Sequence, residues 1–303
     1  MPSSPESPSE NGGQPSLGPG PSKSTLAPGL YVVSTPIGNL GDISSRALTT
    51  LQSVDTIACE DTRVTAVLLR RYGITTPMTP YHDHNAERAR PKLLTQMAGG
   101  GRVALVSDAG TPLLSDPGFK LVQACAAQSI VVTPIPGASA MLAALVTAAL
   151  PTDRVLFAGF LPPKQGARRR SLAELKAVPA TLVFYESGPR LADSLTDMAA
   201  ELGPRMAAVC RELTKRHEEV RRGDLATLAA AYESEGAPKG EIVIVVGGPA
   251  AEAEASPEDV DSALRTALAT MSVRDAASAV AAALDQPKRT VYARALALAH
   301  EDP

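Results

Sequence analysis

Polar and small residues follow directly after a short apolar run near the middle of the chain. Val103–Val106 has the length and character of a buried parallel strand. Ser107, Asp108, Gly110 and Thr111 come immediately after it. Open α/β sheets bind small ligands beyond the carboxyl ends of their strands. These residue types in this order therefore predict a pocket that offers bare backbone, hydroxyl groups and a carboxylate to a small molecule.

Two other segments have the same character. The segment 34–42 is rich in Gly and Pro and follows an apolar run, and the segment 134–140 contains Ser139, which can cap the next helix while facing a cleft. Neither segment has the Gly-x-Gly-x-x-Gly pattern, and Gly-Lys-Ser/Thr is absent from the sequence, so nicotinamide and nucleoside triphosphate binding are not favoured. A single segment of this kind can be a tight turn without function. Three in one domain favour a shared ligand cleft.

Charged residues also follow predicted strands. Asp61 and Arg63 come after the second strand, and Glu212 and Lys215 come after a later one. Asp61 can equally be the N-cap of the next helix, with Arg63 paired to it on the surface. The sequence leaves both interpretations open: a helix cap, or charges that handle a substrate beside a bound cofactor.

Basic residues are concentrated in one part of an acidic chain. Residues 153–222 contain thirteen Lys or Arg against nine Asp or Glu, a local balance of +4 in a chain with a net charge of −3. A solvated run of charge is the simpler interpretation of Arg168–Arg170. The alternative is a surface that binds an anionic substrate such as a nucleic-acid backbone. The candidates for that surface are Arg168, Arg169, Arg170, Arg190, Arg211 and Arg216.

The elements that must position these residues alternate between strands and helices. Strands are expected at 30–34, 56–58, 78–80, 103–107 and 130–133. Helices are expected at 62–72, 86–99 (capped by Asn85), 117–128 and 139–150, the last of which closes this unit. Such alternation predicts a parallel sheet with right-handed crossovers.

A second α/β unit is expected to follow. Residues 150–160 are interpreted as a linker that leads into a new strand, with strands at 181–185, 207–210 and 241–246 and helices at 190–202 and 225–235. Helical signals fill the end of the chain, where Ser256 and Asp259 have the spacing of a capping box. The expected organisation is a disordered tail (1–28), two α/β domains (29–150 and 151–249) with a cleft between them, and a small helical, helix-turn-helix-like module (250–303).

Composition excludes several classes of protein. Aromatic residues make up 3% of the chain and Trp is absent, so large stacking platforms for single-stranded nucleic acid are not expected. The three cysteines form neither a disulfide framework nor a zinc pattern, and we expect no metal site. No apolar run reaches the ~18 residues of a membrane helix, and no signal peptide is recognisable, so a cytoplasmic location is expected.

Taken together, the strand-end motifs resemble those of the tetrapyrrole-methylase superfamily, in the branch that methylates ribosomal RNA. The motifs are Ser34–Asp42, Cys59–Arg63, Val106–Pro112, Pro136–Ser139, Phe184–Pro189 and Arg211–Lys215. The Glu-Asp-Thr-Arg and Ser-Asp-Ala-Gly-Thr-Pro blocks are specific to that branch. The resemblance covers about residues 29–248 and the C-terminal helical module.

This resemblance implies a two-domain α/β enzyme, usually a homodimer, that holds S-adenosylmethionine between its domains. It further implies 2′-O-methylation of a cytidine in the decoding region of 16S ribosomal RNA. The expected partner is this RNA within the 30S subunit, and the sequence leaves open whether the substrate is naked RNA or the assembled subunit. By position, the residues that look like cofactor contacts are Pro36, Asp108, Ala109, Gly110, Thr111, Leu114, Ser139, Ala140, Glu186, Leu213, Gly240 and Glu241. Several of them would act through backbone atoms, and the last two look like contacts on the adenine side.

Methyl transfer to a ribose hydroxyl is an in-line displacement, for which the protein supplies alignment. A ribose hydroxyl is a poor nucleophile at neutral pH, so a base or a nearby cation should help. Asp61, Arg63, Glu212 and Lys215 are the candidate catalytic residues, because they are predicted at strand ends that face the cleft.

Other functions remain open from the sequence. One is C-methylation of a tetrapyrrole or another small substrate, and another is an RNA-binding protein that kept the fold without catalysis. The C-terminal helices can bind RNA through Arg274, Lys288, Arg289 and Arg294. Because that segment is net acidic, dimerisation or simple packing is an equal alternative.

Overall fold

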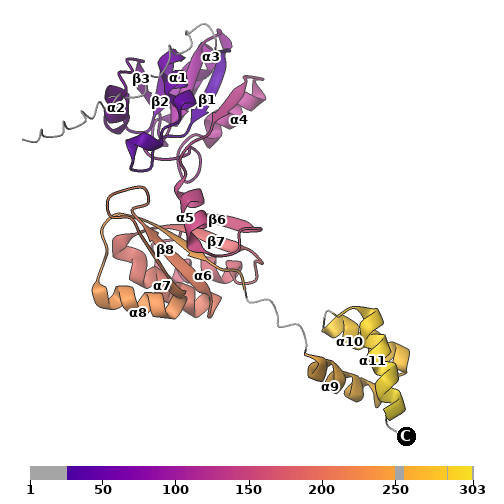
Figure 1. Ribbon diagram of the computed structural model, residues 1–303. Coiled ribbons are helices and arrows are strands. Elements are labelled where there is room, and N and C mark those ends of the chain that lie inside the picture. The colour runs from indigo at the N-terminus through magenta and orange to yellow at the C-terminus, as the bar shows by residue number, and fades with distance from the viewer. Residues whose placement is uncertain (1–25, 250–255, 285, 302–303) are drawn as a thin grey trace, which may run out of the picture.

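The computed structural model describes residues 26–249, 256–284 and 286–301. Two α/β halves lie one above the other in Figure 1, followed by the separate group of C-terminal helices. Most of the predicted N-terminal tail, residues 1–25, lies outside the described residues. Leu26 belongs to the tail predicted from the sequence, but it packs against the core of the first half.

The first half is built on a parallel sheet with the order β3-β2-β4-β1-β5. This confirms the predicted parallel α/β unit, with strand bounds shifted by two residues or fewer at either end. Its elements are β1 (Gly29–Val33), α1 (Ser45–Ser53), β2 (Thr56–Cys59), α2 (Thr62–Arg71), β3 (Met78–Pro80), α3 (Ala86–Ala98), β4 (Arg102–Val106), α4 (Phe119–Ala127), β5 (Val132–Ile135) and α5 (Ala140–Ala148), with a short 3-10 helix η2 (Leu40–Asp42).

Two helix starts differ from prediction. Asn85 precedes α3 but its side chain makes no capping hydrogen bond, because its amide oxygen accepts from the backbone N–H of His82 at 3.0 Å instead. The helix α4 begins at Phe119 rather than at Pro117, since Gly118 precedes it with φ of 134°. The preceding loop is therefore longer than expected, and it extends to Gly118.

The second half contains a mixed sheet with the order β6-β7-β10-β8-β9, in which only β6 and β7 pair in parallel. Its elements are β6 (Val155–Phe160), α6 (Gln165–Leu175), β7 (Thr181–Ser187), η3 (Gly188–Arg190), α7 (Leu191–Leu202), β8 (Met206–Arg211), β9 (Glu219–Asp224), α8 (Leu225–Glu235) and β10 (Glu241–Val246).

Three elements of this half were missed or misjudged. Residues 155–160 form the strand β6 rather than the end of a linker. The edge strand β9 was missed because charged residues and Gly surround its single apolar residue, Val220. The helix α6 was missed because three consecutive arginines hide its apolar positions.

The helix α5 connects the two halves (Figure 1). We expected it to close the first unit, but its buried residues Ala144, Leu145 and Ala148 pack on the second sheet. There they meet Val243 and Val245 of β10, while the alternate residues of that strand face the other core of the second half. The halves therefore share a core through α5, which holds the facing ends of the two sheets together.

The C-terminal helices α9 (Pro257–Leu268), α10 (Val273–Ala283) and α11 (Lys288–Glu301) pack on one another. The predicted capping box is confirmed, because Ser256 and Asp259 exchange side chain–backbone hydrogen bonds at the start of α9. Leu264, Ala277 and Val291 contribute one buried residue from each helix to their common core. Within the described ranges, no helix is long and apolar enough to cross a membrane.

Candidate active site

The three loops that follow β1, β4 and β5 are joined by hydrogen bonds. Thr35 and Gly110 exchange both of their backbone hydrogen bonds, at 2.8 and 3.1 Å. The Ser34 and Thr111 hydroxyls lie 2.9 Å apart, and Thr111 donates to the carbonyl of Ala138 at 3.2 Å. The predicted meeting of three small-residue segments at the carboxyl edge of the first sheet is confirmed.

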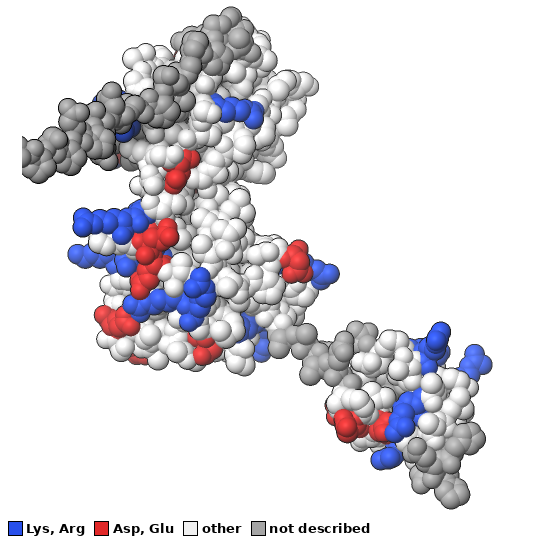
Figure 2. All heavy atoms as spheres, in the orientation of Figure 1, with Lys and Arg blue, Asp and Glu red and all other residues white. Residues whose placement is uncertain are grey.

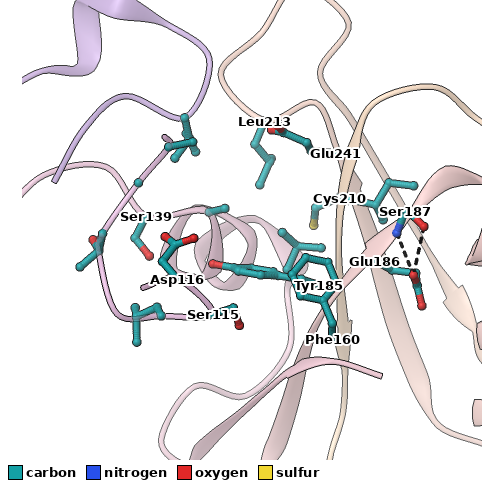
Figure 3. Close-up of a pocket in the computed structure, with 18 of the residues that line it drawn as sticks. Ser115, Asp116, Ser139, Phe160, Tyr185, Glu186, Ser187, Cys210, Leu213 and Glu241 are labelled. Atoms are coloured by element: carbon teal, nitrogen blue, oxygen red, sulfur yellow. Dashed lines mark hydrogen bonds between the residues drawn. The ribbon is translucent and has the colours of Figure 1, made fainter. Parts of the chain in front are cut away.

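A cavity of about 380 Å³ lies between this edge and the second sheet. Figure 3 shows residues of both halves around it. The volume is in the range of small-molecule sites. The lining residues are Ile37, Ala109, Gly110, Thr111, Leu114, Ser115, Asp116, Ser139, Ala140, Phe160, Tyr185, Glu186, Ser187, Cys210, Leu213, Gly240, Glu241, Ile242 and Val243.

Most residues predicted to contact a cofactor line this one cavity. They are Ala109, Gly110, Thr111, Leu114, Ser139, Ala140, Glu186, Leu213, Gly240 and Glu241. Pro36 and Asp108 are the exceptions: Pro36 is buried, and the Asp108 carboxylate accepts the backbone N–H of Asp61 at 3.0 Å. The structure therefore leaves these two outside the lining of the cavity.

Sequence reasoning missed an aromatic wall and a carboxylate. The Tyr185 ring meets Phe157 and Phe160 edge-on, with centroids 4.9 and 5.5 Å apart, and Tyr185 and Phe160 line the cavity. Asp116 lines the opposite side (Figure 3). It lies in the same loop as Gly110, and a polar residue in a loop already predicted to form the site was the signal that could have found it.

Glu186 lines the cavity, but its carboxylate forms hydrogen bonds with residues of the second half. It accepts from the Ser187 backbone N–H at 2.8 Å and from the Ser194 hydroxyl at 2.6 Å, and Arg190 lies 3.3 Å away. With three polar partners and 3% exposure, this side chain fixes the end of β7.

Glu212, Lys215 and Glu241 form a small ion-pair network at the rim of the cavity. The Lys215 ammonium lies 2.7 Å from Glu212 and 3.0 Å from Glu241. The hydrogen bond from Lys215 lowers the pKa of the Glu212 carboxyl below its ordinary value. The Lys215 stem also lies so close to Gly38 of the first half that a β-carbon at Gly38 would clash with it. The network thus helps hold the two halves together at the rim.

Asp61 and Arg63 form an ion pair with each other. Asp61 caps α2 by accepting the Arg63 backbone N–H at 2.8 Å, and the guanidinium of Arg63 pairs with the same carboxylate at 2.6 Å. The hydrogen bonds from Arg63 lower the pKa of Asp61 to about 2. The helix-cap interpretation therefore describes this pair, and neither residue lines the cavity.

The structure does not support a single basic surface formed by all six predicted arginines. Arg168 is 3% exposed and pairs with Asp197 of α7 at 2.7 Å, so its prediction as an RNA contact is wrong. It faces inward because α6 packs on α7. The next arginine, Arg169, pairs with Glu201 on the same helix α7.

Of the other four arginines, two interact with neighbouring residues and two are exposed. Arg190 donates to the Leu161 carbonyl, and Arg211 pairs with Glu219 at 3.1 Å. Arg170 and Arg216 are exposed, and neither forms an ion pair with any described residue. Lys and Arg side chains are visible on the second half in Figure 2, with acidic side chains among them.

Comparison with known proteins identifies the family. The profile of the tetrapyrrole (corrin/porphyrin) methylases matches residues 29–229, and that of the RsmI C-terminal HTH domain matches residues 254–299. The chain belongs to the tetrapyrrole methylase family. Methylases of this family use S-adenosylmethionine, and the chain is an S-adenosylmethionine-dependent methyltransferase.

Named relatives extend this comparison along most of the chain. The ribosomal RNA small subunit methyltransferase I of Mesorhizobium japonicum is 54% identical over 274 residues, which is 90% of this chain and 93% of that protein. The protein of the same name from Escherichia coli O157:H7 is 45% identical and covers 88% of this chain and 94% of its own length.

A solved methylase shares the fold. The uroporphyrin-III C-methyltransferase of Thermus thermophilus, solved in complex with S-adenosylhomocysteine, has a TM-score of 0.50 and 18% identity and covers 72% of this chain and 96% of its own. The cavity described above suits the methylase cofactor, because its lining combines apolar and aromatic side chains with the hydroxyls of Thr111 and Ser139 and the exposed backbone of Gly240. No cluster of three or more His, Cys, Asp or Glu in the described part of the chain is arranged to hold a metal ion.

Proposed function

We propose that this methylase transfers the methyl group of S-adenosylmethionine to the 2′-oxygen of a cytidine in the decoding region of 16S ribosomal RNA. The observation that carries the proposal is the 54% identity to a ribosomal RNA small subunit methyltransferase I across 90% of the chain. The cavity between the halves supports it, because ten positions chosen from the sequence as cofactor contacts line that one space.

The proposed cofactor pose follows from the two walls of the cavity. Gly240 has φ of 105°, and a β-carbon there would collide with Glu212, so the backbone of this wall is open only because the residue is glycine. This wall is the proposed adenine side. The reactive methyl group then lies toward the loop after β4, where Gly110 and Thr111 leave room for the RNA ribose.

Contacts to RNA are proposed for two groups of cations. Arg170 and Arg216 are exposed on the second half. Arg274, Lys288 and Arg289 surround a hollow on the C-terminal helices together with Tyr292, which is 40% exposed. The three cations of this hollow form no ion pair with any described residue, so their charge is free to meet phosphates.

The cellular context is part of the proposal. We propose that the reaction takes place on the assembled 30S subunit in the cytoplasm and that the protein forms a homodimer. The helix α5 supports a dimer, because Leu142 and Val146 lie one turn apart and are 55% and 81% exposed. The proposed domains keep the bounds 29–150, 151–249 and 250–303, and the tail that precedes them ends before Leu26, which packs on the core of the first half.

The function is tested by label transfer. The purified protein is incubated with S-adenosylmethionine labelled in its methyl group and with 30S subunits from bacteria that lack this methyltransferase. Nuclease digestion and mass spectrometry then locate the label, and 30S subunits that already carry the modification are the control. Label on one cytidine ribose of the unmodified subunits is expected. Label on a base, or transfer only to a small tetrapyrrole, would contradict the proposal.

A further inference from the structure

The loop after β4 holds Asp116 in a constrained position. Leu113 and Ser115 have φ of 76° and 65°, and Gly110 and Gly118 also have positive φ. Non-glycine residues adopt such angles at a cost of about 1–3 kcal/mol, and they persist where the surrounding structure enforces them. The contacts of Gly110 with Thr35 and the tight packing of Gly118 on Leu105 enforce them here. The carboxylate of Asp116 is thereby presented to the cavity.

The surroundings of Asp116 provide no neutralising charge. Asp116 is half-buried in the cavity wall, and Figure 3 shows its carboxylate directed toward the hydroxyl end of Tyr185. Within the described residues it forms no ion pair. The charge of Asp108 in the same loop acts on Asp116, and the charge of Asp116 acts in turn on Glu60 after β2 and on Tyr185 of β7. None of these three groups is a cation.

These surroundings raise the proton affinity of the carboxylate. Burial raises the pKa of Asp116 above its ordinary value, the hydrogen bond from Ser107 opposes that shift, and the charge of Asp108 adds to it. In its ionised form, a carboxylate with a raised pKa is a stronger proton acceptor than one whose pKa an ion pair has lowered. Asp61 shows the opposite case, since Arg63 lowers its pKa to about 2.

We infer that Asp116 is the general base of methyl transfer, an inference that rests on the function proposed above. The ribose O–H bond breaks and its proton passes to an Asp116 carboxylate oxygen. A bond forms between the ribose oxygen and the methyl carbon as the sulfur–methyl bond breaks, with its electron pair left on sulfur. The products are the 2′-methoxy ribose, S-adenosylhomocysteine and protonated Asp116, which returns its proton to water.

The acidic residues of the rim do not fit this role. Glu212 and Glu241 both pair with Lys215, and the Glu186 carboxylate is surrounded by donors. A base that already accepts strong hydrogen bonds has lost part of its affinity for a proton. Among the carboxylates that line the cavity, only Asp116 combines access to that space with the absence of a cationic partner in the described residues.

The inference is tested with Asp116→Asn, which keeps the shape of the side chain. At saturating 30S subunits and S-adenosylmethionine we expect kcat to fall by about 10²–10⁴-fold, the range for loss of a general base. The parent rate should rise with pH up to a plateau, and the residual rate of the variant should lack that rise. The Kd for S-adenosylhomocysteine, from calorimetry, should stay within threefold of the parent. Asp193→Asn, an exposed Asp on α7, is the matched control and should keep the parent rate.

A measurement without turnover provides the second test. Carbon-13 NMR of aspartate-labelled protein, with Asp116→Asn to assign the signal, should show Asp116 titrating above an ordinary aspartate. A kcat within threefold of the parent in a folded Asp116→Asn variant, or a titration at or below the ordinary value, would overturn the inference. If the parent itself fails to label 30S subunits, the proposed function fails instead. The two failures are therefore distinguishable.

Discussion

The carboxylates in the two walls of the cavity differ in whether they have a cationic partner. On the second half, Glu186, Glu212 and Glu241 each have at least one cationic or hydroxyl partner. On the first half, Asp116 faces the same space with no cationic partner among the described residues. The contrast teaches that a charged residue at the rim of a cleft is not by itself a catalytic candidate. What its carboxylate already binds decides whether it can accept a proton.

The backbone shows a related contrast. The β4–α4 loop of the first half contains four residues with positive φ between Gly110 and Gly118, whereas the rim of the second half has Glu212, Thr214 and Gly240. Both walls therefore hold constrained turns. Only the turn of the first half presents a carboxylate without a cationic partner, that of Asp116. We therefore assign proton transfer to the first half and binding of the cofactor to both halves.

The largest expected effect on cofactor binding comes from filling the cavity. Ala109 is exposed and lines the cavity on the first half, so Ala109→Trp should place a large ring where the cofactor binds. We expect the Kd for S-adenosylmethionine, from calorimetry, to rise by at least about 100-fold, because a site that buries most of its ligand cannot also hold an indole.

Ala126→Trp is the matched control, since Ala126 is an exposed alanine of α4 outside the cavity lining. Its affinity for S-adenosylmethionine should equal that of the parent. Unchanged binding by Ala109→Trp would show that the cofactor does not bind in this cavity. The difference between its two walls would then have no bearing on catalysis.

A buried charge of the second half should matter for stability. Arg168 and Asp197 are 3% and 2% exposed and pair at 2.7 Å. Removing one partner leaves a buried charge without compensation, so Arg168→Leu should lower the free energy of unfolding by about 3–5 kcal/mol. Urea denaturation measures this change.

The double variant Arg168→Met/Asp197→Leu removes both charges and should recover most of the loss. If the single variant loses less than about 1 kcal/mol and its Kd for RNA rises, the result would contradict the structural role given to Arg168. It would support the RNA contact predicted from the sequence instead.

The cations of the C-terminal hollow should affect RNA affinity. Changing Arg274, Lys288 and Arg289 to Gln removes three charges that have no described ion-pair partner. We expect the Kd for 30S subunits to rise by about tenfold in 0.1 M salt and the slope of log K against log salt to become shallower by about two to three. Filter binding over a salt series checks both values.

The exposed Arg265 of α9 lies outside that hollow, and Arg265→Gln serves as the control. If the triple variant keeps both the affinity and the salt slope of the parent, the helices serve packing or dimerisation, as the sequence also allowed.

The smallest effect concerns the rim network and its pH dependence. Because the hydrogen bond from Lys215 lowers the pKa of Glu212, this pair stabilises the fold above the unfolded pKa of Glu212. That stabilisation is lost as the pH falls through the lower folded value. Lys215→Met should therefore reduce the free energy of unfolding by about 1 kcal/mol at pH 7, and the difference should disappear as the pH falls below the range in which a glutamate carboxyl ionises. A difference independent of pH would assign the effect to the packing of the Lys215 stem on Gly38.

Much of the fold followed from apolar periodicity. The runs that became β4 and β10 are continuous and apolar because both faces of these strands are buried, and such runs are visible in a sequence. The edge strand β9 and the helix α6 were missed because ion pairs, as with Arg221 and Glu235 or Arg168 and Asp197, replace apolar contacts there. Pairing between residues distant in sequence leaves no local pattern.

The site was predictable where it depends on backbone and small side chains. Gly110, Thr111 and Ser139 were found because strand ends and helix caps have local signatures. Asp116 was missed, and Asp61 and Lys215 were chosen as catalytic candidates, because local sequence does not show which carboxylate receives an arginine or a lysine. That distinction depends on the tertiary arrangement.

The most direct test of our account is a crystal structure of the chain with S-adenosylhomocysteine. Its central measurement is the distance from the ligand sulfur to the nearer Asp116 carboxylate oxygen. A methyl group and one ribose hydroxyl must fit between them, so we predict about 6–8 Å, with the adenine toward Gly240. A sulfur on the Glu241 side of the cavity, or a ligand bound elsewhere, would contradict the assignment of the chemistry to the first half.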